Sequence, residues 1–88
     1  MSEFTLQDLV EELRACAGEA EGVDVDSVDI MDLPFLEIGY DSLALLQVTG
    51  ILKRERDIQL DDDEVLGAET PRLLLKIINE NLPSQRAA

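Results

Sequence analysis

Apolar residues recur at helical spacing in three separate segments of the chain, at residues 6–17, 42–56 and 71–82. Each segment places its apolar side chains on one face of a helix, which is typical of helices that pack around a shared core. Only the Val-Asp-Val-Asp run at residues 23–26 resembles a strand, and no second segment is available to pair with it. The pattern therefore predicts an all-α bundle.

Local signals define the start of the first helix. Thr5 is the predicted N-cap, and Asp8 lies three residues later, as in a variant of the capping box. Phe4 and Leu9 have the spacing of a hydrophobic staple across the same helix start. The helix is expected to bury one apolar face, which consists of Leu6, Leu9, Val10, Leu13, Cys16 and Ala17.

Two more helices are predicted in the second half of the chain. The acidic residues 61–64 read as the cap and first turn of a short helix that ends by Gly67. The last helix begins with Thr70 as its N-cap and Pro71 at its first position, and Pro83 stops it. Its expected buried face consists of Leu73, Leu74, Ile77 and Ile78.

Residues 19–41 lack helical periodicity and predict a long loop, with one helical turn near Phe35. The predicted fold is thus a four-helix bundle of three main helices and one short one, with this long loop between the first two. The 88 residues suit one domain spanning 1–88. Residues 84–88 are an expected flexible tail.

The helix predicted at residues 42–56 carries two apolar stripes. One should face the core and consists of Ala44, Leu45, Val48, Ile51 and Leu52. Leu43, Leu46 and Gly50 lie on another face, which either packs under the long loop or is exposed to a partner. Gly50 costs the helix about 0.5–1 kcal/mol relative to Ala, so it is expected to allow the close approach of another surface, or of another helix in the same domain.

The composition excludes most catalytic and metal chemistry. The chain has no His, and Cys16 is its single cysteine, so neither a Ser-His nucleophile nor a thiolate pair for zinc is available. Asp24, Asp26 and Asp29 do not match the ligand spacing of an EF-hand calcium loop. No catalytic residue and no metal site is predicted.

The charge and the apolar runs restrict the partners. A net charge of −13 disfavours nucleic acid and anionic membranes, and it favours basic partner surfaces. No apolar run approaches the roughly 18 residues of a membrane span. With one cysteine and no visible signal peptide, we expect a cytoplasmic protein, and a monomer because of its charge.

Ser42 lies where the second main helix begins. The free N–H groups and the positive end of the helix dipole favour an anion at such a position. A phosphate ester on Ser42 would therefore be stabilised by its own helix. Taken alone, however, Asp41-Ser42-Leu43 is better explained as an ordinary helix N-cap.

The wider context of this serine resembles the attachment motif of acyl carrier proteins, in the run Gly39-Tyr40-Asp41-Ser42-Leu43. The resemblance extends over nearly the whole chain, from the amphipathic first helix and the long loop to the final helix opened by Thr70-Pro71. It implies a covalent 4′-phosphopantetheine arm on Ser42, transferred from coenzyme A by a phosphopantetheinyl transferase. The thiol of the arm would hold an acyl chain as a thioester, so the reactive thiol would not be Cys16.

Finer details are similar to the carriers of bacterial type II (aromatic) polyketide synthases. They are residues 16–19, residues 38–45, Thr70-Pro71-Arg72 and Ile78-Asn79. The implied partners are the phosphopantetheinyl transferase, a malonyl transferase, the ketosynthase/chain-length factor, a ketoreductase and cyclases. The pathway would be polyketide and antibiotic biosynthesis.

The resemblance also implies roles for single residues. Asp41 would meet the transferase, and partners would recognise the second helix at Leu43, Leu46, Gln47 and Gly50. Arg72 and Asn79 lie seven residues apart, on one side of the last helix next to Leu75, and would border a cleft for polar cargo. A solvated helix edge explains the latter pair equally well.

One departure from the family concerns charge. Gln47 stands where a Glu is common, and residues 53–56 make the end of the second helix basic. The helix dipole explains basic residues at that end. We therefore expect docking to use Asp41, the apolar stripe and acidic residues outside the second helix. Ketosynthase turnover should then be nearly unchanged when Lys53 and Arg54 are reversed in charge.

Two other functions remain open at this stage. The chain could be an acyl carrier of fatty-acid synthesis, or a non-covalent acidic helical adaptor that presents its second helix to a partner. Replacing Ser42 with Ala separates a carrier from an adaptor, because only the carrier would lose all function with its fold intact.

Overall fold

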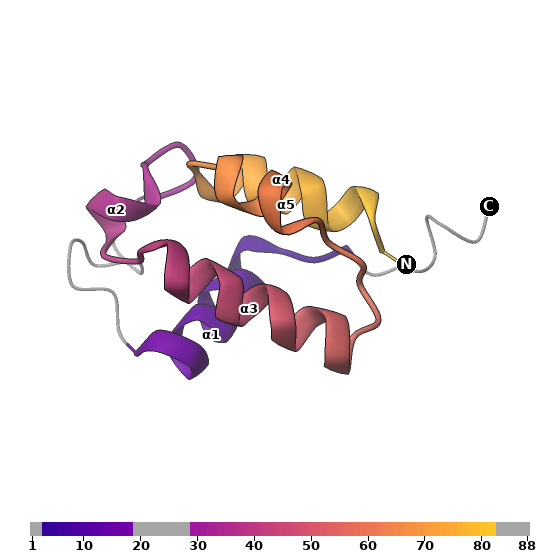
Figure 1. Ribbon diagram of the computed structural model, residues 1–88. Coiled ribbons are helices and arrows are strands. Elements are labelled where there is room, and N and C mark those ends of the chain that lie inside the picture. Colours follow the sequence, from indigo (N-terminus) through magenta and orange to yellow (C-terminus); the bar gives the residue numbers. More distant parts are fainter. Residues whose placement is uncertain (1–2, 19–28, 83–88) are drawn as a thin grey trace.

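The structure is a computed structural model that describes residues 3–18 and 29–82 of the 88-residue chain. Within these residues the secondary structure is entirely helical (Figure 1). The helices are α1 (Leu6–Ala17), α2 (Phe35–Ile38), α3 (Ser42–Glu55), α4 (Asp62–Gly67) and α5 (Pro71–Glu80). The prediction of an all-α bundle with three main helices and one short one is confirmed, and α2 is the helical turn expected near Phe35. None of these helices is long and apolar enough to cross a membrane.

The helix starts follow the capping signals of the sequence. The Thr5 side chain accepts a hydrogen bond from the Asp8 backbone N–H at 3.1 Å, and the Asp8 carboxylate accepts one from the Thr5 backbone N–H at 3.0 Å. Hydrogen bonding to Thr5 lowers the pKa of Asp8. Thr70 caps α5 by accepting a hydrogen bond from the Leu73 N–H, and Pro71 occupies the first turn. These predicted caps are confirmed.

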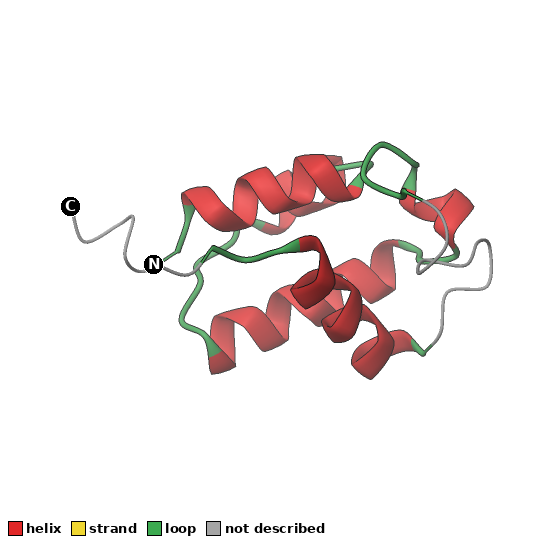
Figure 2. Cartoon of the chain, turned by 180° about the vertical axis from the view of Figure 1, so that it is seen from behind, coloured by secondary structure: helices red, strands yellow, loops and turns green. Residues whose placement is uncertain are grey.

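Four helices form the bundle in the ring order α1, α3, α4, α5, each in contact with two neighbours (Figures 1 and 2). The core between them is mainly aliphatic, and all three aromatic side chains of the chain are buried in it. Its most deeply buried members include Leu9, Leu13, Leu52, Val65, Leu74 and Ile78. Burial of this shared apolar surface is the main driving force for the fold.

The faces of α3 and α5 differ from the prediction at their margins. On α5, Leu73 is 47% exposed and Leu75 is buried, although the sequence pattern assigned Leu73 to the core. At 3.6 residues per turn the buried positions 71, 74, 75 and 78 centre on a direction almost opposite to Leu73. On α3, Ile51 is only half-buried and Thr49 is buried instead, its hydroxyl donating to the Leu45 carbonyl at 2.8 Å.

The predicted loop between the first two main helices lies partly outside the described residues, at 19–28, and so does the predicted tail at 84–88. Its described end is packed against the bundle. The Phe35 N–H donates to the Glu69 carbonyl at 2.8 Å, and the Arg72 N–H donates to the Met31 carbonyl at 2.9 Å. Ile30, Phe35 and Ile38 are buried in the core. These contacts hold the segment before Ser42 against the start of α5.

Candidate functional site

Ser42 is the first residue of α3, and its side chain is exposed. Asp41 is the N-cap, in extended conformation, and its carboxylate accepts a hydrogen bond from the Ala44 N–H at 3.0 Å. Within the described part of the chain, the Ser42 hydroxyl has no hydrogen-bond partner. The hydroxyl is therefore accessible for modification at the positive end of a 14-residue helix.

The two residues before Asp41 fix the direction of the chain at this point. Gly39 has φ 112°, in the left-handed region that favours a residue without Cβ, and its N–H caps the end of α2. Tyr40 is 2% exposed, and its hydroxyl donates to the Gly18 carbonyl at the end of α1 at 3.0 Å. A left-handed glycine and a buried tyrosine thus hold the start of α3 in place.

A cavity of about 490 Å³ opens beside Ser42, between α2, α3 and α4. Two leucines at this cavity are strongly exposed for apolar residues, Leu36 at 77% and Leu66 at 44%. The residues that line the cavity are Pro34, Phe35, Leu36, Tyr40, Asp41, Ser42, Leu45, Leu66, Ala68 and Glu69. Nothing in the local spacing of Leu36 and Leu66 distinguishes them from core leucines, so their place at this cavity was not predictable from the sequence.

The second apolar stripe of α3 lies on the surface. Leu43 is 63% exposed, Gln47 and Gly50 are exposed, and Leu46 is half-buried. Of the two alternatives that the sequence left open for this stripe, exposure is the one the structure adopts within the described residues. A groove of about 420 Å³ runs along it, which we call the α3 groove; its lining residues are Cys16, Leu46, Gln47, Gly50, Ile51 and Arg54.

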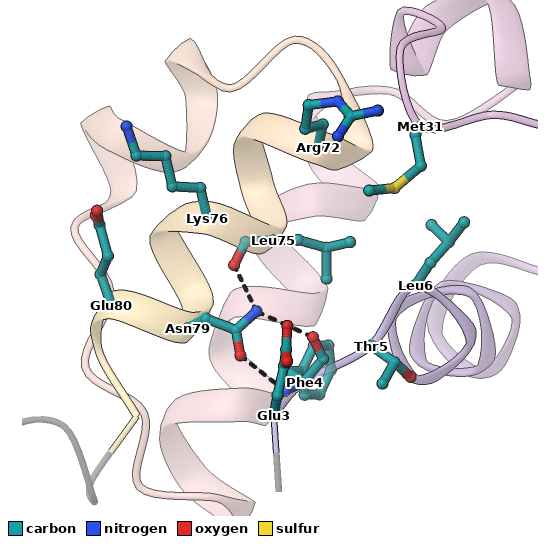
Figure 3. A pocket seen from close by; sticks show the side chains of 10 residues that line it. All are labelled: Glu3, Phe4, Thr5, Leu6, Met31, Arg72, Leu75, Lys76, Asn79 and Glu80. Carbon is teal, nitrogen blue, oxygen red and sulfur yellow. Dashed lines mark hydrogen bonds between the residues drawn. The ribbon is translucent and has the colours of Figure 1, made fainter.

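Arg72 and Asn79 line one cavity of about 580 Å³ together with Leu75, as their spacing predicted (Figure 3). Arg72 pairs with Asp32 through two hydrogen bonds, from Nε at 2.8 Å and from Nη2 at 3.1 Å. This pairing lowers the pKa of the Asp32 carboxyl and raises the pKa of the Arg72 guanidinium. Both side chains are largely exposed, so the pair contributes little to stability.

Asn79 is fully engaged within the protein. Its Oδ1 accepts a hydrogen bond from the Phe4 N–H at 2.8 Å, and its Nδ2 donates to the Phe4 carbonyl at 3.0 Å (Figure 3). The same Nδ2 donates to the Leu75 carbonyl at 2.9 Å. The side chain therefore ties the N-terminal segment to α5, a role that the sequence analysis missed because the two partners are 75 residues apart.

A metal ion needs several side chains of His, Cys, Asp or Glu arranged around it. No three His, Cys, Asp or Glu residues of the described ranges come together as metal ligands. Cys16 is half-buried, and this burial raises the pKa of its thiol, with the carboxylates of Glu12 and Glu55 raising it further. A raised pKa disfavours the nucleophilic thiolate.

Comparison with known proteins agrees with an exposed serine at a helix start. A family model described as a phosphopantetheine attachment site matches residues 11–78 of the chain. The oxytetracycline polyketide synthase acyl carrier protein of Streptomyces rimosus is 46% identical over 82 residues, which cover 93% of this chain and 85% of that protein. The chain belongs to the acyl carrier protein family.

Solved structures of the same family have the same fold. The 3,7-dioxo-octyl actinorhodin acyl carrier protein of Streptomyces coelicolor superposes with a TM-score of 0.81 at 41% identity, covering 97% of this chain and 95% of that one. The holo form of the actinorhodin carrier superposes with a TM-score of 0.75 at 40% identity, covering 94% and 95%. These relatives are carriers from type II polyketide synthases, as the sequence resemblance predicted.

Membership of this family answers two questions about the chemistry. The cofactor is covalently attached 4′-phosphopantetheine, and the chain is a carrier and not an enzyme. Both predictions are confirmed. The residues present fit such a group, because an exposed hydroxyl lies at the start of a long helix and beside a partly apolar cavity.

Proposed function

We propose that the chain carries its 4′-phosphopantetheine on Ser42 and holds polyketide intermediates on it as thioesters. The observation that supports this most directly is the unpartnered hydroxyl of Ser42 at the start of α3. Helix N–H groups and the helix dipole there stabilise the phosphodiester that the modification creates. Asp41 keeps its carboxylate turned to the Ala44 N–H, which leaves the hydroxyl side open to a transferase.

The attachment reaction needs little from the carrier itself. The Ser42 oxygen forms a bond to the phosphorus next to the pantetheine, and the pyrophosphate bond of coenzyme A breaks. The nucleotide part of coenzyme A leaves, and the hydroxyl proton passes to the transferase. The carrier contributes an exposed serine, Asp41 as the adjacent acidic contact and Leu43 as an exposed apolar contact for that enzyme.

The polyketide pathway is supported by the similarity to carriers of oxytetracycline and actinorhodin synthesis. Components of a type II polyketide synthase are the corresponding partners: a malonyl transferase, a ketosynthase/chain-length factor, a ketoreductase and cyclases. We propose that they recognise Asp41, Leu43, Leu46, Gln47 and Gly50, which form an exposed surface beside Ser42. We propose antibiotic biosynthesis as the pathway. That the protein is a monomer and lies in the cytoplasm stays a prediction.

For polar cargo we propose Arg72 as a contact, because an exposed ion pair with Asp32 exchanges readily for another acceptor. Asn79 is less suited to this role. Its donors and acceptor are already used by Phe4 and Leu75, and a cargo carbonyl would have to replace one of these bonds. Of the two residues that the resemblance placed at a cargo cleft, Arg72 is therefore the one that we propose to contact the cargo.

The test is intact-protein mass spectrometry after incubation with coenzyme A and a promiscuous phosphopantetheinyl transferase. We expect a single phosphopantetheine adduct on the wild type and none on Ser42→Ala, with helical circular dichroism spectra that superimpose. An adduct on folded Ser42→Ala would place the arm elsewhere. A folded wild type without an adduct would favour the non-covalent adaptor, and loading that is followed by turnover only with fatty-acid enzymes would favour a fatty-acid carrier.

A further inference from the structure

Gly50 is the one feature of α3 that the packing of the described residues does not explain. It lies in the interior of the helix, where glycine costs about 0.5–1 kcal/mol relative to Ala. A Cβ built at Gly50 would meet nothing within 4 Å, so no neighbouring element requires the absence of a side chain. Its backbone is helical, so no special conformation requires glycine either. The missing side chain instead hollows the surface.

That hollow forms the middle of the α3 groove. Leu46 and Ile51 supply half-buried apolar walls, and Cys16 of α1 supplies the opposite side. Leu43, Gln47, Gly50 and Arg54 follow one another at helical spacing and form a straight line along the exposed face of α3. The groove is therefore shaped for a protruding side chain, with a polar rim along one edge.

Arg54 is the only cation at this end of α3 without a partner in the described part of the chain. Lys53 Nζ lies 3.4 Å from the Asp62 carboxylate. Arg56 Nε lies 3.8 Å from the Glu12 carboxylate, and its guanidinium stacks 5.3 Å from the centre of the Phe4 ring. The helix dipole explains a basic helix end in general, but it does not explain why one guanidinium lines a groove unpaired.

We propose that the α3 groove is a socket for a synthase component, which inserts an apolar side chain over Gly50 and pairs a carboxylate with Arg54. A guanidinium favours planar carboxylates, with which it forms two parallel hydrogen bonds. This deepens the proposed function and rests on it, since the partner is an enzyme that acts on the carrier. The sequence led us to expect that the charges of Lys53 and Arg54 do not matter for docking. The proposal revises this expectation for Arg54, and the expectation stays in force for Lys53, which is already paired.

The socket gives the docking surface a direction. Arg54 lies thirteen positions after Asp41, which corresponds to about 20 Å along a helix axis. A carboxylate at one end and a guanidinium at the other require a basic group and an acidic group on the partner in that order. A partner that docks in reverse would bring like charges together, which disfavours it. The pattern thus orients Ser42 toward the partner's active site.

The test compares pairs of variants that differ in one property. Arg54→Glu and Gly50→Leu should each raise the KM of the holo carrier for a type II ketosynthase component about tenfold, with kcat nearly unchanged. Arg54→Gln should raise it less. A matched control, Lys53→Gln, which removes the neighbouring charge, should stay within about twofold. Gly50→Ala adds only a Cβ to the hollow and should raise the KM less than Gly50→Leu does.

Two readouts separate this proposal from the assignment of Ser42. Adduct formation by mass spectrometry reports the arm, and an NMR titration of unloaded variants with the ketosynthase component gives Kd values that need no arm. Weakened binding by Arg54→Glu and Gly50→Leu, with Lys53→Gln unaffected, supports the socket even if loading fails. Unchanged binding and KM in these two variants, or an equal loss in Lys53→Gln, would overturn it.

Discussion

The two ends of the bundle are built differently (Figure 1). At the end where α3 begins, a cavity with exposed leucines adjoins an unpartnered serine hydroxyl. At the end where α3 stops, Phe4 is buried, Asn79 holds its backbone at both polar atoms, and Arg56 covers its ring. We infer that the tasks are divided between the ends: the Ser42 end meets cargo and partners, while the other end keeps the helices together.

The physical basis of this separation is the coupling of the N-terminal segment to three helices. Phe4 precedes α1, Asn79 belongs to α5 and Arg56 caps the end of α3, where it also approaches Glu12 of α1. The Ser42 end also buries aromatic side chains, but a cavity with two exposed leucines adjoins them. Local opening is expected first at this cavity, where apolar side chains are not covered.

Replacing Phe4 with Ala should have the largest effect on stability of the substitutions considered at either end. The ring is 4% exposed, so its loss leaves a cavity between three helices. The substitution also removes the contact of the ring with Arg56. We expect a loss of about 3–5 kcal/mol of unfolding free energy, measured by urea denaturation. The matched change at the other end, Leu36→Ala, should stay within about 0.5 kcal/mol, because Leu36 is 77% exposed. Similar losses in both variants would remove the distinction between the ends.

Replacing Asn79 with Asp tests the hydrogen bonds alone, because the two side chains have nearly the same shape. The variant loses both donor contacts, to the carbonyls of Phe4 and Leu75, and places a carboxylate next to them. We expect a loss of about 1–3 kcal/mol of unfolding free energy at neutral pH. Phosphopantetheine loading at Ser42 should proceed at the wild-type rate, as followed by mass spectrometry. Impaired loading with unchanged stability would contradict the proposed division of roles.

The smallest expected effect concerns the exposed pair of Arg72 and Asp32. The hydrogen bond from Arg72 lowers the pKa of Asp32, so the pair stabilises the fold above the ordinary carboxyl range. This contribution is lost as the pH falls through the lowered pKa of Asp32, that is, below about pH 4. In an NMR titration of the carboxyl, Arg72→Gln should move the pKa of Asp32 upward toward its ordinary value. An unchanged pKa would show that Arg72 does not hold Asp32 in solution.

The sequence alone predicted the local features of the fold and little of its long-range polar contacts. Thr5 with Asp8 and Thr70 with Pro71 were predictable, because capping depends on residues a few positions apart. Ser42 was identifiable because its motif is contiguous. The assignment of Leu73 to the core failed because an apolar residue can occur on any side of a helix, and only the packing decides which face is covered.

The contacts that the sequence did not predict join distant parts of the chain. The bonds of Asn79 to Phe4 span 75 residues, and the pair of Arg72 and Asp32 spans 40. No periodicity or spacing rule relates residues so far apart, so these partners emerge only from the packed structure. For the same reason the sequence did not distinguish the basic residues at the end of α3, although Lys53 is paired and Arg54 has no partner among residues 3–18 and 29–82.

The hydrogen bond from the Tyr40 hydroxyl to the Gly18 carbonyl has an evolutionary consequence. It fixes the end of α1 and the residue two places before Ser42 to each other, on either side of the intervening sequence. The two ends of this loop therefore stay together as long as its buried residues, Ile30, Phe35 and Ile38, are kept. A lineage of carriers, or a protein engineer, can exchange exposed residues of the loop, such as Glu37, while the serine keeps its place.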